Sequence, residues 1–264
     1  WRFVNVEEPP VPSLLRGFSA PVKLHYPYEA AELVLLMTHD SDAFVRWEAA
    51  QLLAQREILG NVERRAAGAG MQLGRALIEA FRELLTDRLA DPALVAEAMA
   101  LPDEEYLAEQ MTLIDVDGIH AARDFVRSAL ACELQRELHE RHAALAAAGP
   151  YDKSPAAMAQ RSLRSMCLSY LVHTSGGFAL AEAQLSRSDN MTDTLAALQG
   201  LVHNEAPQAP AALADFEERW RRDALVMDKW FAIQACVPGE GTVARVRRLM
   251  AHLAFCLPNP NKAR

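Results

Sequence analysis

Two histidines three residues apart form the feature of this sequence that most suggests catalysis. His139 and His142 flank Glu140 and Arg141 in the segment HERH. A zinc peptidase helix carries the pattern HExxH, because the i, i+4 spacing places both imidazoles beside one metal ion. Here the second histidine comes one residue early, and no third ligand is recognisable nearby. The surrounding charged residues indicate a solvated helix face, so we interpret both histidines as surface residues and predict no metal ligands.

Two other patterns resemble functional sites only in part. Asp115 and Asp117 begin like a calcium loop, but the twelfth position is Val126 where the loop needs Glu, so an aspartate that caps a helix explains them better. Neither Ser169 nor Ser175 lies in the Gly-x-Ser-x-Gly turn of serine hydrolases. We therefore predict no catalytic residues in this chain.

Composition narrows the classes of function. The 264 residues are 51% hydrophobic, which is enough for a sizeable core, and the net charge of −8 argues against a nucleic-acid surface. No apolar run approaches the roughly 18 residues of a membrane span. The four cysteines (Cys132, Cys167, Cys236 and Cys256) are widely spaced among apolar neighbours. We expect buried free thiols in a reducing compartment, with a disulfide as the open alternative, and we predict a cytoplasmic protein.

The sequence predicts a short β remnant followed by helices. Before Tyr28, period-two alternation between prolines predicts two or three strands, which need partner strands to be stable. After Tyr28, apolar residues recur at helical spacing. Helix starts are predicted at Asp42, Asp91 and Ser154, and a single long helix is predicted over 117–147. The other predicted helices cover 73–89, 178–187, 190–203, 210–223, 225–236 and 241–253. The expected fold is mainly α, an irregular repeat-like array of stacked antiparallel helices.

Two segments are unusual for a helical core. The stretch DNMTD begins at Asp189 with a dense polar cap, which we interpret as capping by Asn190 or Asp189. The stretch LVMDKWF, from Leu225, places Asp228 and Lys229 among bulky apolar residues. Either it is an amphipathic helix in which one of these charges reaches solvent, or it is a wall that meets another domain.

Five segments in order resemble bacterial aminopeptidase N, a family of zinc metallopeptidases that prefer alanine. They read LLRGFSAPVKLHY, FVRWEAAQLL, DNMTDTLAAL, LVMDKWFAIQA and NPNKAR, and they span Leu14 to Arg264. The resemblance covers the C-terminal portion of the family. The zinc motif HExxH and the substrate motif GxMEN of that family do not occur here, so no zinc ligand or catalytic residue is carried over.

The resemblance implies a domain organisation. Residues 1–27 would be the end of a small β-sandwich domain, and residues 28–264 a helical capping domain truncated at its C-terminus. The partners would be the catalytic and β domains of the same polypeptide and, in the parent enzyme, a peptide substrate, with no nucleic acid or membrane. Zinc would be the cofactor of the parent, and none is expected here. Matching tail residues would line the substrate cavity: Asn259, Asn261, Lys262 and Arg264.

Two alternatives stay open at this point. The chain could be a stand-alone helical scaffold that binds protein partners, which is the usual role of stacked helical repeats. It could also be a metal enzyme that uses His139 and His142. If the resemblance to aminopeptidase N holds instead, the chain would shape the cavity of an aminopeptidase but would be inactive by itself.

Overall fold

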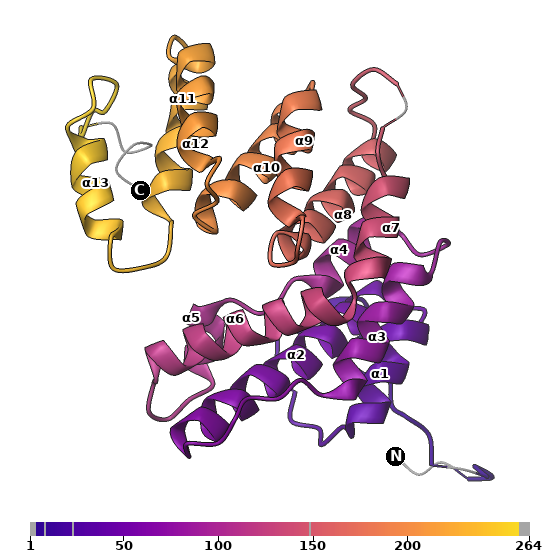
Figure 1. Cartoon of the computed structure of the whole chain (residues 1–264). Coiled ribbons are helices and arrows are strands. Elements are labelled where there is room, and N and C mark those ends of the chain that lie inside the picture. Colours follow the sequence, from indigo (N-terminus) through magenta and orange to yellow (C-terminus); the bar gives the residue numbers. More distant parts are fainter. Residues whose placement is uncertain (1–3, 8, 23, 148, 259–264) are drawn as a thin grey trace.

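Helices dominate the architecture. The structure, a computed structural model, describes residues 4–7, 9–22, 24–147 and 149–258, and these form thirteen α-helices and one 3-10 helix, with no strand among them (Figure 1). None of the helices in these ranges has the length and apolar character needed to cross a bilayer. The elements in chain order are η1 (Arg16–Phe18), α1 (Ala30–His39), α2 (Ala43–Ala66), α3 (Arg75–Thr86), α4 (Pro92–Met99), α5 (Glu104–Glu109), α6 (Val116–Glu133), α7 (Gln135–Ala144), α8 (Pro155–Leu171), α9 (Gly177–Arg187), α10 (Met191–His203), α11 (Ala209–Trp220), α12 (Ala224–Ala235) and α13 (Thr242–Met250).

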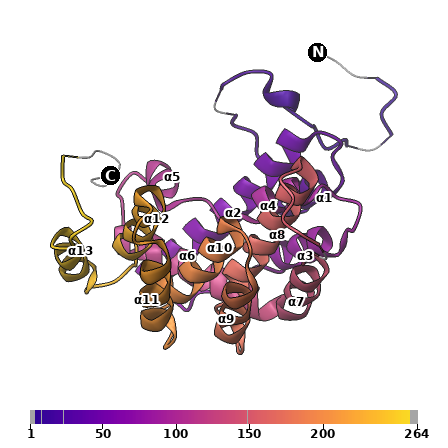
Figure 2. The ribbon, with the colours of Figure 1, turned by 90° about the horizontal axis from the view of Figure 1, so that it is seen from above.

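The predicted helical array is confirmed, and its second half has two rows. In the inner row, α8, α10 and α12 pack against one another in succession. In the outer row, α7, α9 and α11 each pack on the inner helix that follows them in the chain (Figures 1 and 2). The helix α6 lies against α2 and α8, and α4 also packs on α8. The inner row therefore meets the first half of the array through α8.

Local capping explains why several helices begin where the sequence predicts. The Asp42 carboxylate accepts a hydrogen bond from the backbone N–H of Val45 at 3.0 Å, and Asp91 caps α4 in the same way. Ser154 caps α8, with a proline at the first position of the helix. Asp115 caps α6 by accepting from the Gly118 N–H at 2.8 Å, which confirms that this aspartate is a cap.

The prediction of one long helix over 117–147 is wrong. The helix breaks at Leu134, whose φ of −111° and ψ of 15° end α6 and begin α7. No glycine or proline marks this position, and Leu134 itself is buried. The bend lets α6 pack on α2 while α7 packs between α3 and α8, so tertiary packing decides the break. The short helix α5 was also absent from the sequence prediction.

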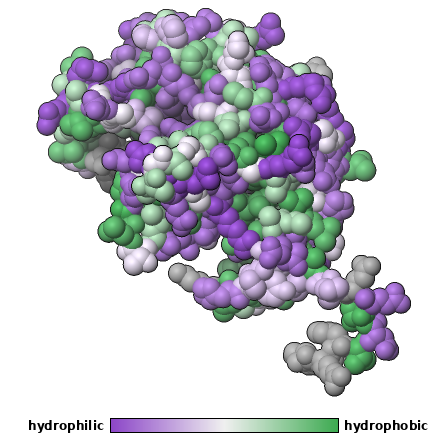
Figure 3. Space-filling model, turned by 60° about the horizontal axis from the view of Figure 1, so that its bottom comes forward, coloured by the Kyte–Doolittle hydropathy of each residue, from purple (hydrophilic) through white to green (hydrophobic). Residues whose placement is uncertain are grey.

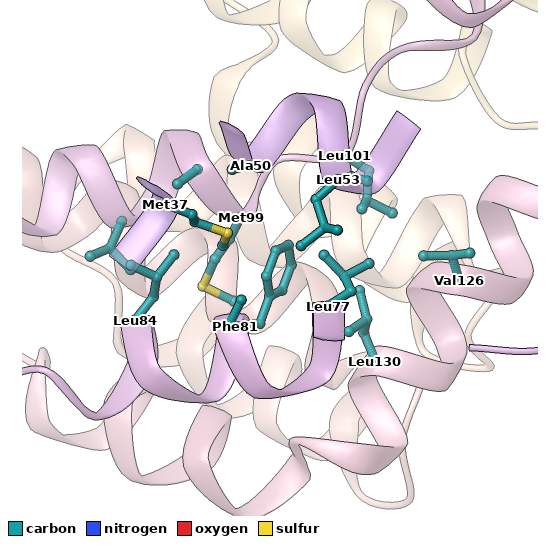
Figure 4. Packing of buried hydrophobic residues seen from close by; sticks show 14 of the residues in the cluster. Met37, Ala50, Leu53, Leu77, Phe81, Leu84, Met99, Leu101, Val126 and Leu130 are labelled. Carbon is teal, nitrogen blue, oxygen red and sulfur yellow. The ribbon is translucent and has the colours of Figure 1, made fainter. Parts of the chain in front are cut away.

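Two groups of buried side chains form the core, and α8 belongs to both. The first group holds Cys167 and Tyr170 of α8 with side chains of α1 to α7, and the second holds Leu168 and Val172 with side chains of α9 to α13. Figure 4 shows the first group around Phe81, which is fully buried. Burying a side chain of this size stabilises the fold by roughly 1.5–3 kcal/mol. The helix α8 therefore joins the two halves of the array.

The predicted N-terminal strands are not formed in the described part of residues 1–27. A strand needs a neighbour to pair its backbone groups, and this segment has none. Instead, side chains hold it to the helices. Arg16 Nη1 donates to Asp40 Oδ1 at 2.8 Å, the Gly17 N–H donates to Asp42 Oδ2 at 2.9 Å, and Tyr28 Oη donates to the Pro12 carbonyl at 2.7 Å.

The start of α2 braces this segment against the array. Arg46 Nε donates to the Met37 carbonyl at 2.9 Å, which ties α2 to α1. The rings of Phe18 and Phe44 lie 5.1 Å apart, and those of Phe44 and Trp47 lie 5.8 Å apart. These aromatic contacts join the N-terminal segment to the helical region.

Candidate functional site

A hollow of about 450 Å³ lies between α6 and the inner row, at the seam between the two core groups. The helix α6 contributes Asp124 and Arg127, α8 contributes serines and Met166, and α10 contributes Gln199 and Gly200. An added Cβ at Gly200 would lie 3.0 Å from the Val172 side chain, so the glycine permits the close approach of α10 to α8. The floor of the hollow is therefore set by the contact between these two helices.

Arg127 is the principal charge in this hollow. It is half-buried, and within the described ranges its guanidinium makes no hydrogen bond and no ion pair within 4 Å. Asp124 lies one turn earlier on α6, and its carboxylate is 3.5 Å from His120 Nε2. The other ring nitrogen of His120 lies 2.8 Å from Glu104, so these two carboxylates raise the pKa of His120. Asp124 thus interacts with His120, and no acidic side chain among the described residues forms an ion pair with Arg127.

Two histidines face the same hollow and are held neutral. Burial is the main cause that lowers the pKa of His173 and of His203, and the charge of Arg127 lowers both further. The Nε2 of His203 lies 2.9 Å from the Ile233 carbonyl, so Nε2 carries the hydrogen and donates it. Each imidazole therefore offers a neutral donor or acceptor near the cation of Arg127.

Hydroxyl groups complete the lining. Ser169 Oγ donates to the Met166 carbonyl at 2.7 Å, whereas Ser165 Oγ is buried and has no hydrogen-bond partner. No hydrogen bond among the described residues joins a serine hydroxyl to a histidine ring, so the hollow has donors but no nucleophile activated by a neighbouring base. Its chemistry suits binding of a polar ligand and does not suggest catalysis.

The interpretation of His142 as a surface residue is wrong. His142 is buried, as are Glu137 and Arg141 on the same helix, whereas His139 is half-buried. The reason is that α7 lies between α3 and α8, where Arg82 of α3 meets Glu137 at 3.1 Å. Within the described ranges, no group of three or more His, Cys, Asp or Glu side chains is arranged to hold a metal ion. These residues do not fit a zinc site.

The polar cap of α10 is confirmed, and it extends further than the sequence indicates. Asn190 Oδ1 accepts from the Asp193 N–H at 3.0 Å. Asp193 is buried, and Arg164 of α8 lies 3.2 Å from its carboxylate. Gln184 Nε2 donates to the Asp193 carbonyl at 3.1 Å and its Oε1 lies 2.9 Å from His142 Nε2. This buried network joins α7, α8, α9 and α10, and local sequence carried no signal for it.

The segment from Leu225 forms α12, whose exposed face carries Leu225 as well as Lys229, so the helix is amphipathic only in part and the hypothesis of a wall against another domain stays a prediction. Lys229 is exposed and Asp228 is half-buried, while Trp230 and Phe231 lie in the second core group. Trp230 Nε1 donates to the Leu213 carbonyl at 3.0 Å, which ties α12 to α11.

Two other predictions have different outcomes. Of the four cysteines, which are all free, Cys167 alone is buried, so the expectation of four buried thiols is wrong for Cys132, Cys236 and Cys256. These three lie near helix ends or after the last helix, where apolar neighbours in sequence do not cover them. The predicted cavity-lining residues of the tail fall outside the described residues: Asn259, Asn261, Lys262 and Arg264.

The family match and the related proteins described next agree with one another. Residues 30–264 match a family described as "Domain of unknown function (DUF3458_C) ARM repeats". Proteins named aminopeptidase N from Haemophilus influenzae and Escherichia coli are 36% and 38% identical, each over 264 residues. These alignments cover 100% and 99% of this chain but 30% of each relative. The chain thus spans about 30% of the length of these relatives.

A solved structure agrees with the sequence comparison. It is titled "Crystal structure of Legionella pneumophila aminopeptidase A in complex with aspartic acid" and matches with a TM-score of 0.86 and 32% identity. The match covers 99% of this chain and 31% of that chain. The fold, the matching repeats and the similarity along the whole length agree, and the chain belongs to the DUF3458_C family of ARM-repeat domains and is similar to the C-terminal part of bacterial aminopeptidase N.

Proposed function

We propose that this chain is the helical capping domain of a zinc-dependent aminopeptidase and forms a wall of the cavity in which peptides lose their N-terminal residues. The observation that carries the proposal is the similarity over the full chain to proteins named aminopeptidase N, of which it spans about 30%. The polar hollow between α6 and the inner row suits the lining of such a cavity, because it offers donors and an unpaired cation without catalytic groups of its own.

In this proposal the domains divide as the resemblance implies. Residues 1–27 belong to the end of a β-sandwich domain, and residues 28–264 form the capping domain. The whole enzyme is proposed to act in the cytoplasm. The exposed apolar side chains of the N-terminal segment support this division. Figure 3 shows this segment extending from the body with hydrophobic side chains on it, and Val4, Phe18 and Val22 are each more than half exposed. Another part of the polypeptide would cover them.

Zinc and the general base would belong to another part of the same polypeptide, since no group of described residues fits a zinc site. Zinc, when bound there, supplies an activated water for peptide hydrolysis. The contribution of this chain would be to enclose the cavity and to bind the distal part of the peptide. Asn259, Asn261, Lys262 and Arg264 are proposed to line the cavity as well.

The test compares the full-length gene product with the 264-residue chain on alanine anilides. We expect turnover by the full-length protein that is lost on chelation and restored by zinc, and no turnover by the isolated chain. Robust, chelator-sensitive turnover by the isolated chain would contradict the proposal. A full-length protein without aminopeptidase activity would favour the second candidate, a protein-binding scaffold, which the description of the family as ARM repeats supports.

A further inference from the structure

The hollow between α6 and the inner row holds a cation that no acidic side chain of the described residues pairs with, beside two neutral imidazoles. A half-buried guanidinium that forms no ion pair is costly unless a ligand or solvent satisfies it. Arg127 is in this position, and Asp124, the acidic residue nearest to it on α6, is engaged by His120. Ser165 also lines the hollow, but its Oγ is buried below the surface. The guanidinium of Arg127 prefers an acceptor that carries negative charge.

The remaining lining limits the kind of anion that fits. Met166, Val172 and Pro238 give the hollow apolar walls beside the polar groups. Its volume of about 450 Å³ exceeds the space that an inorganic anion needs and lies in the range of sites for small organic ligands. A ligand with a carboxylate next to small apolar groups would pair with Arg127 and also cover these walls.

We propose that the hollow binds the C-terminal carboxylate of a short peptide, with Arg127 as the group that pairs with the carboxylate. This inference rests on the proposed function, in which peptides enter the cavity that the chain encloses. His173 and His203 flank the carboxylate as neutral imidazoles, and the apolar walls contact the last side chain of the peptide. Arg127 contacts the peptide directly in this proposal and is a binding residue that takes no part in bond cleavage.

Calorimetric titration of the 264-residue chain with three probes tests the assignment. The probes are N-acetyl-trialanine, the C-terminal amide of the same peptide, and inorganic phosphate. We expect the acid to bind at least about tenfold more tightly than the amide, since a charge-assisted hydrogen bond is lost. Equal binding of acid and amide would overturn the proposal. Phosphate that competes with the acid at similar affinity would assign the hollow to inorganic anions and would also overturn it.

Variants locate the binding. Arg127→Gln should weaken binding of the acid by at least about tenfold, to the level of the amide. The matched control is Arg75→Gln, because Arg75 lies on α3, is 89% exposed and lines no part of the hollow. Unchanged binding in Arg127→Gln would refute the assignment. If that variant fails to fold, the proposal is still tested by comparing how tightly the unaltered chain binds the peptide acid and the peptide amide.

The outcome is separable from that of the proposed function. In an active full-length enzyme, Arg127→Gln should raise KM for trialanine by at least about tenfold and leave KM for an alanine anilide, which has no C-terminal carboxylate, unchanged. If Arg127→Gln left the KM for trialanine unchanged in an active enzyme, the carboxylate site would be refuted and the aminopeptidase assignment would stand. A full-length protein without aminopeptidase activity would contradict the aminopeptidase assignment. The calorimetric titration of the chain with the peptide acid would still test the binding site separately.

Discussion

His142 on α7 donates a hydrogen bond from Nε2 to Oε1 of Gln184 on α9, over 2.9 Å, and both side chains are buried. The orientation of the glutamine is fixed because its Nε2 donates to the Asp193 carbonyl at 3.1 Å. The imidazole Nε2 therefore carries a hydrogen and donates it. A protonated ring would bring a charge into this buried network near Arg164, and burial indeed lowers the pKa of His142.

This lowered pKa predicts that the protein loses stability in mild acid. The unfolded chain binds a proton on His142 near its ordinary pKa of about 6.5, whereas the folded chain resists it. The stabilising contribution is therefore fully present above about pH 6.5 and is lost as the pH falls toward the folded pKa. His173 and His203 act in the same direction, and His120, whose pKa is raised, acts in the opposite one.

Urea unfolding at pH 8 and pH 5.5 measures this effect. We expect a smaller free energy of unfolding at pH 5.5, and a smaller difference between the two pH values in His142→Gln, which cannot take up the proton. His139→Gln is the matched control on the same helix, since His139 is only half-buried. If His142→Gln kept the full pH difference, the titration of His142 would not contribute.

The thiols give a second prediction that separates buried from exposed positions. Burial raises the pKa of Cys167 to about 12, whereas the other three cysteines are exposed. Since the thiolate is the reactive form, a disulfide reagent at pH 8 should modify three thiols quickly in the native protein and a fourth only after unfolding. In Cys167→Ala the count should be three in both states. Four fast thiols in the native protein would contradict the burial of Cys167.

Which features of the fold could be predicted from the sequence depended on how far apart in the chain the interacting residues lie. The caps at Asp42, Asp115 and Asn190 were predictable, because a capping side chain bonds to backbone two or three residues away. The burial of α7 was not, since its sequence is polar and the partners of Glu137 and His142 lie 55 and 42 residues away. Local periodicity contains no information about such partners.

The candidate site shows the same limit. In the sequence, Arg127 is an ordinary charged residue on an amphipathic helix. Its lack of a partner follows only from the side chains that α6, α8 and α10 place around the hollow. The residues that the resemblance placed in a cavity, Asn259, Asn261, Lys262 and Arg264, lie in the tail outside the described residues, so their role stays a prediction.

The first residue of α9 gives a third prediction. A Cβ added to Gly177 would lie 1.9 Å from the Leu171 carbonyl oxygen, a backbone atom that cannot move aside. Gly177→Ala should therefore destabilise the fold by about 3 kcal/mol. Gly60→Ala is the matched control, because nothing lies within 4 Å of its added Cβ in the middle of α2. This control should stabilise the helix by about 0.5–1 kcal/mol. Denaturant unfolding compares them, and equal effects would refute the close approach at Gly177.

A fourth prediction concerns the helix that joins the two halves of the array. Tyr170 Oη on α8 donates to the Met99 carbonyl at the end of α4 over 2.7 Å, and both residues are buried. The Tyr170 ring also meets Phe81 edge-on, with ring centres 6.5 Å apart. Tyr170→Phe keeps the ring and leaves the Met99 carbonyl without its donor, so it should cost about 1–3 kcal/mol.

The matched control for Tyr170→Phe is Tyr151→Phe, since Tyr151 is mostly exposed and its ring, against which Arg161 packs, is retained. That change should alter the free energy of unfolding by less than about 0.5 kcal/mol. Because Tyr170 belongs to the first core group and α8 to both, the loss should appear in a single cooperative transition if the two halves unfold together. Two separate transitions in Tyr170→Phe, with the first shifted alone, would show that α8 does not couple the halves.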